Sequence, residues 1–400
     1  MTDIKKITLS SGKVRYRFVL DIGRGGDGKR KQLTVTRATL REAKAELFRI
    51  ESEQGSGVFV PPNRLTVNNW IDQWLGKKAE DLEETTIYNY RITLNRVRGK
   101  LGGILLQELT EEDVEEWMKW ALKYGRIRGG KAGTPLGVTT VDMSLARLKE
   151  CLNRAVTKRL VPTNVAQHLT IPRRARKEER KTKEELKPWS VAEVHAFVQG
   201  IRVDRLYAPL LLSLMGLRPA EICGLRWEDI DLESGTISIA NTRTMMGNKT
   251  VVEKDTKSMA GERELPLPVP VWDALRSFKS LQAKEKLALG PDYLDSGYVL
   301  VDEVGEVRNI KQLRRRAYRI MALLGLRQVR LYDARASCFT YLANMGVPDH
   351  LLARWAGHAN VLTTKRWYVK PGVEDLRAAA TVWGGLHGSG DDIPRGRERL

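Results

Sequence analysis

Residues 356–368 read AGHANVLTTKRWY, so His358 precedes Tyr368 by ten positions. Upstream, residues 216–221 read GLRPAE and residues 332–335 read YDAR. Each stretch alone is a weak signal, since arginines are common and most tyrosines pack inside proteins. Together they set two arginines, a histidine and a late tyrosine in one order along the chain. That order decides how the second half of the chain is interpreted.

The composition favours a folded protein that binds a polyanion. The chain has 400 residues, too many for one ordinary core, so two or three domains are expected. Its 68 basic and 49 acidic residues are interspersed and give a formal charge of +19, with a pI near 9.8. A basic surface attracts phosphates and releases their counterions. A soluble protein that merely happens to be basic is the alternative from charge alone.

Several features argue against other classes of protein. Cys151, Cys223 and Cys338 are far apart and form no CxxC pair, and Cys151 and Cys223 lie in apolar helical contexts, which indicates reduced core thiols in a cytoplasmic protein. The first residues show no signal-peptide pattern, and the longest apolar run, Ala208–Leu217, is interrupted and predicts a buried helix rather than a membrane span. Histidines without ligand spacing predict no metal site, and the lack of a P-loop predicts no nucleotide cofactor.

Residues 1–60 predict a small β-sheet followed by a helix. Residues 14–20 alternate basic and apolar side chains, a glycine-rich turn follows, and residues 31–35 form a second strand. A helix with apolar side chains at helical spacing completes the segment. Arg15 and Arg17 fall on one strand face, which either enters a DNA groove or is simply solvated.

Residues 65–171 predict an all-helical domain. Tryptophans and aliphatic residues recur at helical spacing, and Thr110 precedes acidic residues that suit a helix N-terminus. These apolar stripes are interpreted as core. Residues 172–187 form a basic connector, extended or partly helical, that can follow a phosphate backbone. Its candidate DNA-binding cations are Arg173, Arg174, Arg176 and Lys177. A nuclear-localisation signal has a similar composition.

Residues 188–385 mix helices and strands, and residues 386–400 form a tail. Helices are predicted at 190–199, 205–215 and 219–224, strands at 236–240, 251–254 and 264–267, and helices again from residue 270. Lys257 falls in the hairpin turn predicted between the last two strands. The predicted fold class is therefore multidomain α+β. It comprises a small N-terminal sheet with a helix, an all-α middle domain, and a mostly α last domain with a small antiparallel sheet.

Chemistry on a phosphodiester explains why these residue types occur together. Without a metal ion, an enzyme must supply cations to the non-bridging oxygens, an acid to the leaving oxygen and a nucleophile in line. Arg218 and Arg335 suit the first task, because a guanidinium is always charged and grips two oxygens, although either alone is more typical of a surface ion pair. Lys257 can protonate a leaving 5′ oxygen if cationic neighbours lower its pKa, but turn lysines are usually just solvated.

Residues 185–380 resemble the catalytic domain of the tyrosine recombinase (phage integrase) family. That family uses Arg–Lys–His–Arg–His/Trp–Tyr in this order, and the resemblance assigns five of these six roles, all but the first histidine, to Arg218, Lys257, Arg335, His358 and Tyr368. Glu221 matches a supporting acidic position. Residues 65–171 resemble the family's helical core-binding (SAM-like) domain, and residues 1–60 resemble its arm-type DNA-binding domain.

One position departs from the family pattern. The usual His-x-x-Arg box reads YDAR here, so Tyr332 stands where the family has histidine. A tyrosine hydroxyl donates a hydrogen bond to phosphate but is a poor base at neutral pH, so slower chemistry is expected. Tyr341 is a rival nucleophile that is interpreted as core. Tyr368, which precedes a Pro-Gly pair, is the predicted nucleophile.

The resemblance implies conservative site-specific recombination through a 3′-phosphotyrosyl intermediate, without cofactors. It implies double-stranded attachment sites, a homotetramer on two sites, and accessory DNA-bending or directionality factors. It also implies a cytoplasmic, nucleoid-associated enzyme of a prokaryotic host that integrates or excises a phage or mobile element. Residues 373–383 are either a helix that docks on a neighbouring protomer or one that packs on its own domain. A type IB topoisomerase and a non-catalytic DNA-binding regulator are the alternatives.

Overall fold

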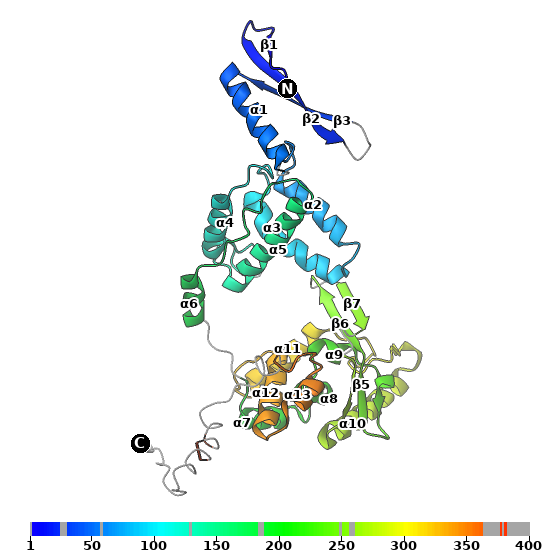
Figure 1. Ribbon diagram of the computed structural model, residues 1–400. Helices are drawn as coiled ribbons and strands as arrows, with labels where there is room; N and C mark the ends of the chain where they lie inside the picture. Colours follow the sequence, from blue (N-terminus) through cyan, green and yellow to red (C-terminus); the bar gives the residue numbers. More distant parts are fainter. Residues whose placement is uncertain are drawn as a thin grey trace. The chain divides into compact units, whose positions relative to one another are not determined.

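The computed structural model describes residues 2–24, 30–56, 59–127, 130–182, 188–247, 250–255 and 261–362, together with 377, 380 and 381. The chain divides into two compact units, Met1–Glu184 and Glu185–Leu400. Helices and small antiparallel sheets make up both, so the predicted α+β fold class is confirmed (Figure 1).

A sheet and a helix form the N-terminal part. The elements are β1 (Lys5–Thr8), β2 (Val14–Arg24), β3 (Arg30–Arg37) and α1 (Leu40–Gly55), with the strands antiparallel in the order β1-β2-β3. Strand alternation turns Phe18 and Leu20 to one face, where they pack with Ala43 and Ile50 of α1. The sequence predicted β2, β3 and α1 but not β1, because Ile7 is the single apolar residue of that strand.

A helical bundle follows in the first unit. Its helices are α2 (Val67–Lys78), α3 (Glu84–Leu101), α4 (Glu111–Tyr124), α5 (Val138–Thr157) and α6 (Arg173–Thr182). The predicted apolar stripes of these helices pack together in one core, in which Trp70 Nε1 donates to the Cys151 carbonyl at 3.0 Å. Thr110 starts α4 through reciprocal hydrogen bonds with Asp113, as the sequence predicted.

Helix α6 shows that the basic connector is partly helical. Ala175 packs against the bundle core, and Glu179 Oε1 accepts a hydrogen bond from the backbone nitrogen of Val138 at 3.1 Å. That contact satisfies one of the free N–H groups at the start of α5. Residues 183–187 of the predicted connector lie outside the described residues.

The second unit is mostly helical. Its helices are α7 (Val191–Ile201), α8 (Tyr207–Leu214), α9 (Pro219–Gly224), α10 (Val269–Leu289), α11 (Ile310–Leu323), α12 (Leu331–Asn344) and α13 (Asp349–Ala356), with short 3₁₀ turns η1 (Trp227–Asp229) and η2 (Gly290–Asp292). Helix α8 is the predicted buried helix, since Leu210 and Leu212 are wholly buried within it.

Two small antiparallel sheets join these helices. One has β4 (Ile230–Asp231), β5 (Thr236–Ile239) and β8 (Arg263–Pro266) in the order β4-β5-β8, and the other pairs β6 (Asn241–Met246) with β7 (Thr250–Asp255). The predicted hairpin turn around Lys257 is therefore wrong. Strand β7 pairs with β6 and β8 with β5, so the segment between β7 and β8 connects two sheets. The sequence analysis missed β6, which lacks a clear apolar alternation.

Helix α9 lies close against strand β6. A Cβ atom on Gly224 would approach backbone atoms of Thr242 and Arg243 to 2.9 Å, closer than real Cβ contacts. Only glycine permits this approach. The end of α9 is thereby held against the two-stranded sheet.

Cys151 and Cys223 are buried free thiols, as predicted, and Cys338 is a partly exposed one. Within the described residues, every helix is too short or too polar to cross a bilayer. In the same residues no cluster of three or more histidine, cysteine or acidic side chains could hold a metal ion.

Candidate active site

Arg218 lies where the chain turns from α8 into α9. Gly216 has a φ of +100°, which favours glycine, and Pro219 occupies the first position of α9. The Arg218 side chain is 28% exposed. It donates from Nη1 to Glu221 Oε1 at 2.6 Å and from Nη2 to the Gly357 carbonyl at 3.1 Å. Fixed acceptors thus orient the guanidinium while part of it stays at the surface.

Glu221 is buried and binds two arginines. Its Oε2 accepts from the Arg218 backbone nitrogen at 2.7 Å, and Arg263 donates to both carboxylate oxygens at 3.1 Å. Burial alone would raise the pKa of Glu221, but the hydrogen bond and charge of Arg263, followed by the charge of Arg218, lower it overall. Glu221 is therefore ionised at neutral pH and contacts Arg218.

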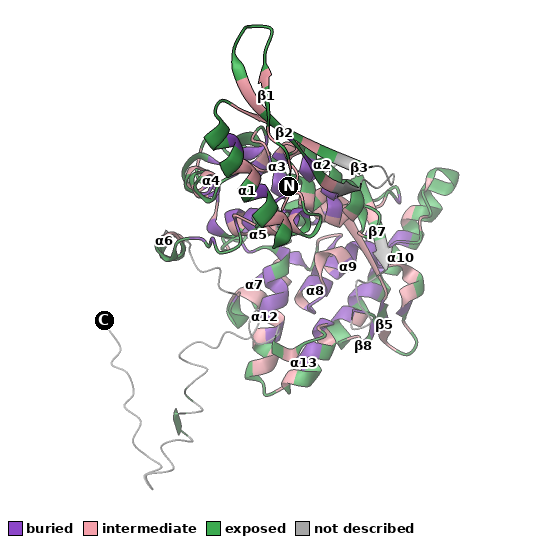
Figure 2. Cartoon of the chain, turned by 45° about the horizontal axis from the view of Figure 1, so that its top comes forward, coloured by how far each residue is buried: buried purple, intermediate pink, exposed green. Residues whose placement is uncertain are grey.

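Three arginines donate to three successive carbonyl oxygens at the C-terminal end of α13. The pairs are Arg263 Nε with Trp355 at 2.7 Å, Arg335 Nη2 with Ala356, and Arg218 Nη2 with Gly357 at 3.1 Å. A helix end leaves such carbonyls without helical partners and with partial negative charge, which cations stabilise. We call Arg218, Arg263 and Arg335 the arginine cap. Figure 2 shows α8, α9, α12 and α13 gathered in this unit.

Arg335 is the most deeply buried member of the arginine cap. Its side chain is wholly enclosed, and besides the Ala356 carbonyl it donates to the carbonyl of Gly216. The Phe339 ring lies 5.0 Å from its guanidinium carbon. Arg335 therefore ties the turn before Arg218 to the end of α13. Contact between Arg335 and a phosphate stays a prediction.

His358 comes directly after the end of α13, whose carbonyls the arginine cap binds. Gly357 adopts the left-handed conformation at the helix end, and the His358 backbone nitrogen donates to the Ala353 carbonyl at 3.0 Å. Burial, and then the charges of Arg335, Arg218 and Arg263, lower the pKa of His358 to about 4. The ring is thus neutral at neutral pH.

The tautomer of His358 follows from its neighbour. Arg335 Nη2 lies 3.4 Å from His358 Nε2. A guanidinium N–H can only donate, so a neutral ring accepts through Nε2 and carries its proton on Nδ1. The Nδ1–H group is then the hydrogen-bond donor of the ring.

We expect replacement of His358 to change how stability depends on pH. The pKa of His358 falls from an ordinary 6.5 to about 4 on folding, so the unfolded chain binds the extra proton between these values. The stability from the neutral ring is complete above pH 6.5 and is lost as the pH falls towards 4. Discounted for partial exposure, it is about 2 kcal/mol. Urea unfolding at about pH 5 and about pH 8 should differ less for His358→Asn than for the wild type. Equal differences would contradict the lowered pKa.

Tyr332 lies one helical turn before Arg335 on α12, and Tyr332 is 44% exposed. Arg330 is the N-cap of α12, and its guanidinium donates to both oxygens of Asp333 at 2.8 and 2.9 Å. The interpretation of Tyr341 as a core residue is wrong, because it is 46% exposed. The helical period turns Phe339 inward and places Tyr341 on another side of α12.

Two predicted site residues, Lys257 and Tyr368, lie outside the described residues. Their roles stay predictions. The structure brings Arg218, Glu221 and Arg335 together with His358 at the end of α13.

The predicted DNA-binding arginines of the N-terminal sheet share one exposed face. Arg17 is opposite Lys5 on β1 and Thr36 on β3, and Arg15 is opposite Ile7. This face is the reverse of the one that buries Phe18. DNA binding by this face stays a prediction.

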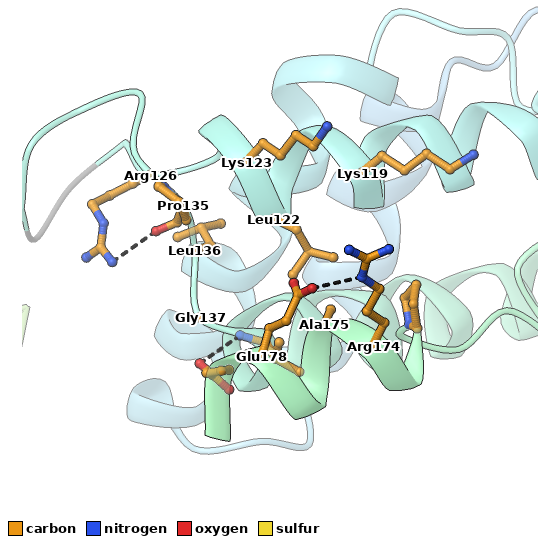
Figure 3. A pocket seen from close by; sticks show the side chains of 13 residues that line it. Lys119, Leu122, Lys123, Arg126, Pro135, Leu136, Gly137, Arg174, Ala175 and Glu178 are labelled. Carbon is orange, nitrogen blue, oxygen red and sulfur yellow. Dashed lines mark hydrogen bonds and ion pairs between the residues drawn. The ribbon is translucent and has the colours of Figure 1, made fainter. Parts of the chain in front are cut away.

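The predicted cations of the connector lie on α6. Arg173, Arg174, Arg176 and Lys177 are exposed. Arg174 pairs with Glu178 at 2.8 Å and Arg176 with Asp142 at 3.2 Å. Figure 3 shows that Arg174 borders a pocket of about 630 Å³ beside α4, with Lys119 and Lys123 across from it. Their DNA contacts stay predictions too.

Arg263 is a site residue that the sequence analysis missed. It is buried in β8 and contacts Glu221 and the end of α13. The available signal was its spacing from Leu265, two residues on, because a strand turns both to one face. A charged residue on the inward face of a strand indicates a buried partner.

The chain matches two family models. Residues 191–374 match the phage integrase family, and residues 66–120 match the N-terminal SAM-like domain of phage integrases. A XerC-like tyrosine recombinase of Caldanaerobacter subterraneus is 23% identical over 379 residues, which cover 90% of this chain and 93% of that protein. An integrase of Streptomyces ambofaciens is 24% identical over 385 residues, covering 93% and 94%.

Solved structures share the fold. The Tn1549 transposon integrase in complex with transposon right end DNA has a TM-score of 0.61 at 18% identity, over 80% of this chain and 99% of that chain. A lambda integrase dimer bound to a core site has a TM-score of 0.54 at 15% identity, over 77% and 97%. The family matches, the relatives and the fold agree, and the chain belongs to the phage integrase family of tyrosine-type site-specific recombinases.

Proposed function

We propose that this recombinase breaks and rejoins DNA at specific sites through a covalent 3′-phosphotyrosyl intermediate. Arg218 and Arg335 bind the scissile phosphate, and His358 donates a hydrogen bond to it. Lys257 is the acid and Tyr368 the nucleophile. The biological role we propose is integration or excision of a phage or mobile element, supported by the integrases among the relatives.

The observation that carries the proposal is the meeting of Arg218, Arg335 and His358 at one helix end. Arg218 and His358 are more than a hundred residues apart in sequence, yet Arg218, Arg335 and His358 all hydrogen-bond to backbone carbonyls at the end of α13. Two guanidiniums beside a neutral ring suit one phosphodiester anion. Cations supplied in this way replace the metal ion that many phosphoryl-transfer sites use.

In the proposed cleavage step, the phenol oxygen of Tyr368 bonds to phosphorus and the bond to the 5′ oxygen breaks. The phenol proton passes to water, and Lys257 gives a proton to the leaving 5′ oxygen. Arg218 and the Nδ1–H group of His358 stabilise charge on the non-bridging oxygens. A 5′-hydroxyl of the partner duplex then attacks phosphorus and releases Tyr368. The phosphotyrosine keeps the bond energy, so the exchange consumes no nucleotide.

The proposed assembly is a homotetramer on two double-stranded attachment sites. Exchange between two duplexes cuts four strands, and each chain supplies one nucleophile under this proposal. The lambda integrase of similar fold was solved as a dimer on a core site. Accessory DNA-bending or directionality factors complete the proposed reaction, which takes place in the cytoplasm of a prokaryotic host.

Covalent capture tests the proposal. The protein is incubated with a library of nicked double-stranded sites, in which the fragment carrying the 5′-hydroxyl diffuses away after cleavage. Sequencing of the covalently bound strands should return one enriched site. Absence of any covalent complex would indicate a DNA-binding regulator. Relaxation of supercoiled DNA without strand exchange would indicate a topoisomerase.

Introducing histidine at position 332 should speed cleavage. Histidine accepts a proton near neutral pH, which tyrosine does not, so Tyr332→His should raise the rate of covalent complex formation about tenfold. Single-turnover rates on the captured site measure the effect, with Tyr332→Phe as the control for the hydroxyl alone. A slower Tyr332→His protein would contradict the view that a base is lacking.

A further inference from the structure

Arg263 connects three parts of the proposed site without reaching the surface. Its side chain is fully buried. Nε donates to the Trp355 carbonyl at 2.7 Å, Nη1 to the Gly261 carbonyl at 3.0 Å, and both Nη atoms to Glu221 at 3.1 Å. Since each of its three guanidinium nitrogens donates to a protein acceptor, Arg263 acts on substrate through the residues that it binds.

We propose that Arg263 is a positioning residue. It neutralises Glu221 and holds the end of α13, so that Arg218 and His358 face the same phosphate. This inference rests on the proposed function. It explains how the proposed phosphate site stays positively charged and rigid.

Arg263 offsets the negative charge that Glu221 places beside Arg218. Glu221 is ionised, buried and 2.6 Å from the Arg218 guanidinium. If Arg218 were its single cationic partner, the pair would be neutral and would attract a phosphate weakly. With Arg263 as a second partner, the three groups carry one net positive charge. That charge lies on the member that reaches the surface, Arg218.

The forked shape of the Arg263 guanidinium joins several elements of the site. Arg263 grips both carboxylate oxygens of Glu221 and, through Nε, the carbonyl of Trp355, two residues before Gly357. A lysine carries the same charge on a single nitrogen and cannot bind acceptors on α9, on α13 and at Gly261, just before β8, at the same time. The charge of Arg263 and the forked shape of its guanidinium therefore make separate contributions to the site, and two substitutions can distinguish them.

Three variants test the proposal on the captured site. Arg263→Met removes charge and fork, and should slow covalent complex formation about 100-fold while DNA affinity stays within about threefold. Arg263→Lys keeps the charge and should slow it about tenfold. Adding Glu221→Gln to Arg263→Met removes the unpaired carboxylate and should restore at least about tenfold of the lost rate.

Arg205 provides a matched control outside the site. It forms a two-pronged ion pair with Glu285 at 2.7 Å and donates to the carbonyls of Val301 and Asp302, so it resembles Arg263 in its bonding. Arg205→Met should lower the midpoint of urea unfolding as Arg263→Met does, yet leave the cleavage rate of the folded protein within about twofold. A general loss of packing would slow both variants alike.

The outcomes separate this inference from the proposed function. If the wild type forms no covalent complex, the proposed function fails. If the wild type is active and folded Arg263→Met cleaves at the same rate, the positioning role is overturned. A double variant no faster than Arg263→Met overturns the charge argument. Should Arg263→Met not fold, Arg263→Gln with and without Glu221→Gln gives the same comparison, because glutamine also removes the charge.

Discussion

The Tyr368→Phe protein should bind its DNA site with wild-type affinity and form no covalent complex with it. The phenol oxygen is the atom that bonds to phosphorus in the proposed step, and phenylalanine keeps the ring but lacks that oxygen. We expect the rate of complex formation to fall by more than about a thousandfold. Denaturing electrophoresis of end-labelled nicked substrate measures the complex, and a mobility shift measures binding.

Tyr341→Phe is the control for this experiment. Tyr341 is an exposed tyrosine on the helix that carries Arg335, so it is the rival with access to a substrate. Its replacement should leave the rate within about twofold. A complex that persists in Tyr368→Phe and disappears in Tyr341→Phe would transfer the role of nucleophile to Tyr341.

The helices were predictable because their signals come from residues that are close together in sequence. Thr110 and Asp113 form the capping box that starts α4, and the following apolar stripe includes Trp117, which is 1% exposed in the bundle core. A cap acts within four residues, and a stripe needs only the helical period. The same holds for α8, whose apolar run could only be a buried helix.

Strand pairing was not predictable, because it depends on distant partners. Strand β7 was predicted, but its neighbour β6 was not, and the chain between β7 and β8 was therefore interpreted as a hairpin turn. In the structure β8 pairs with β5, which precedes it by more than twenty residues. Alternation within one strand gives no information on which other strand it joins.

The candidate site was predictable only in part, because some of its contacts also depend on segments that are distant in sequence. The order of Arg218, Arg335 and His358 along the chain is visible in the sequence, and the structure brings them together. Arg263 was missed because its role depends on the pairing of β8 and on backbone carbonyls at the end of α13. Carbonyl acceptors exist at every residue, so they leave no sequence signal.

Lysine at position 218 and lysine at position 335 should have different consequences. Arg218→Lys keeps a partly exposed cation but loses the two-pronged grip on phosphate, so cleavage should fall about 100-fold. Its effect on the free energy of unfolding should be about 1 kcal/mol or less, because Glu221 keeps Arg263 as a partner. Single-turnover cleavage and urea unfolding measure the two effects.

Arg335→Lys should reduce cleavage by at least as much and should also destabilise the fold. The Arg335 side chain is wholly buried, and its guanidinium serves the carbonyls of Gly216 and Ala356 on two separate elements. A single ammonium cannot satisfy both acceptors, and a buried polar group that loses its partner costs about 1–3 kcal/mol. The expected loss of stability is therefore about 3 kcal/mol. An Arg335→Lys protein as stable as Arg218→Lys would show that Arg335 does not hold the end of α13. Full cleavage activity in either protein would remove that arginine from the proposed phosphate site.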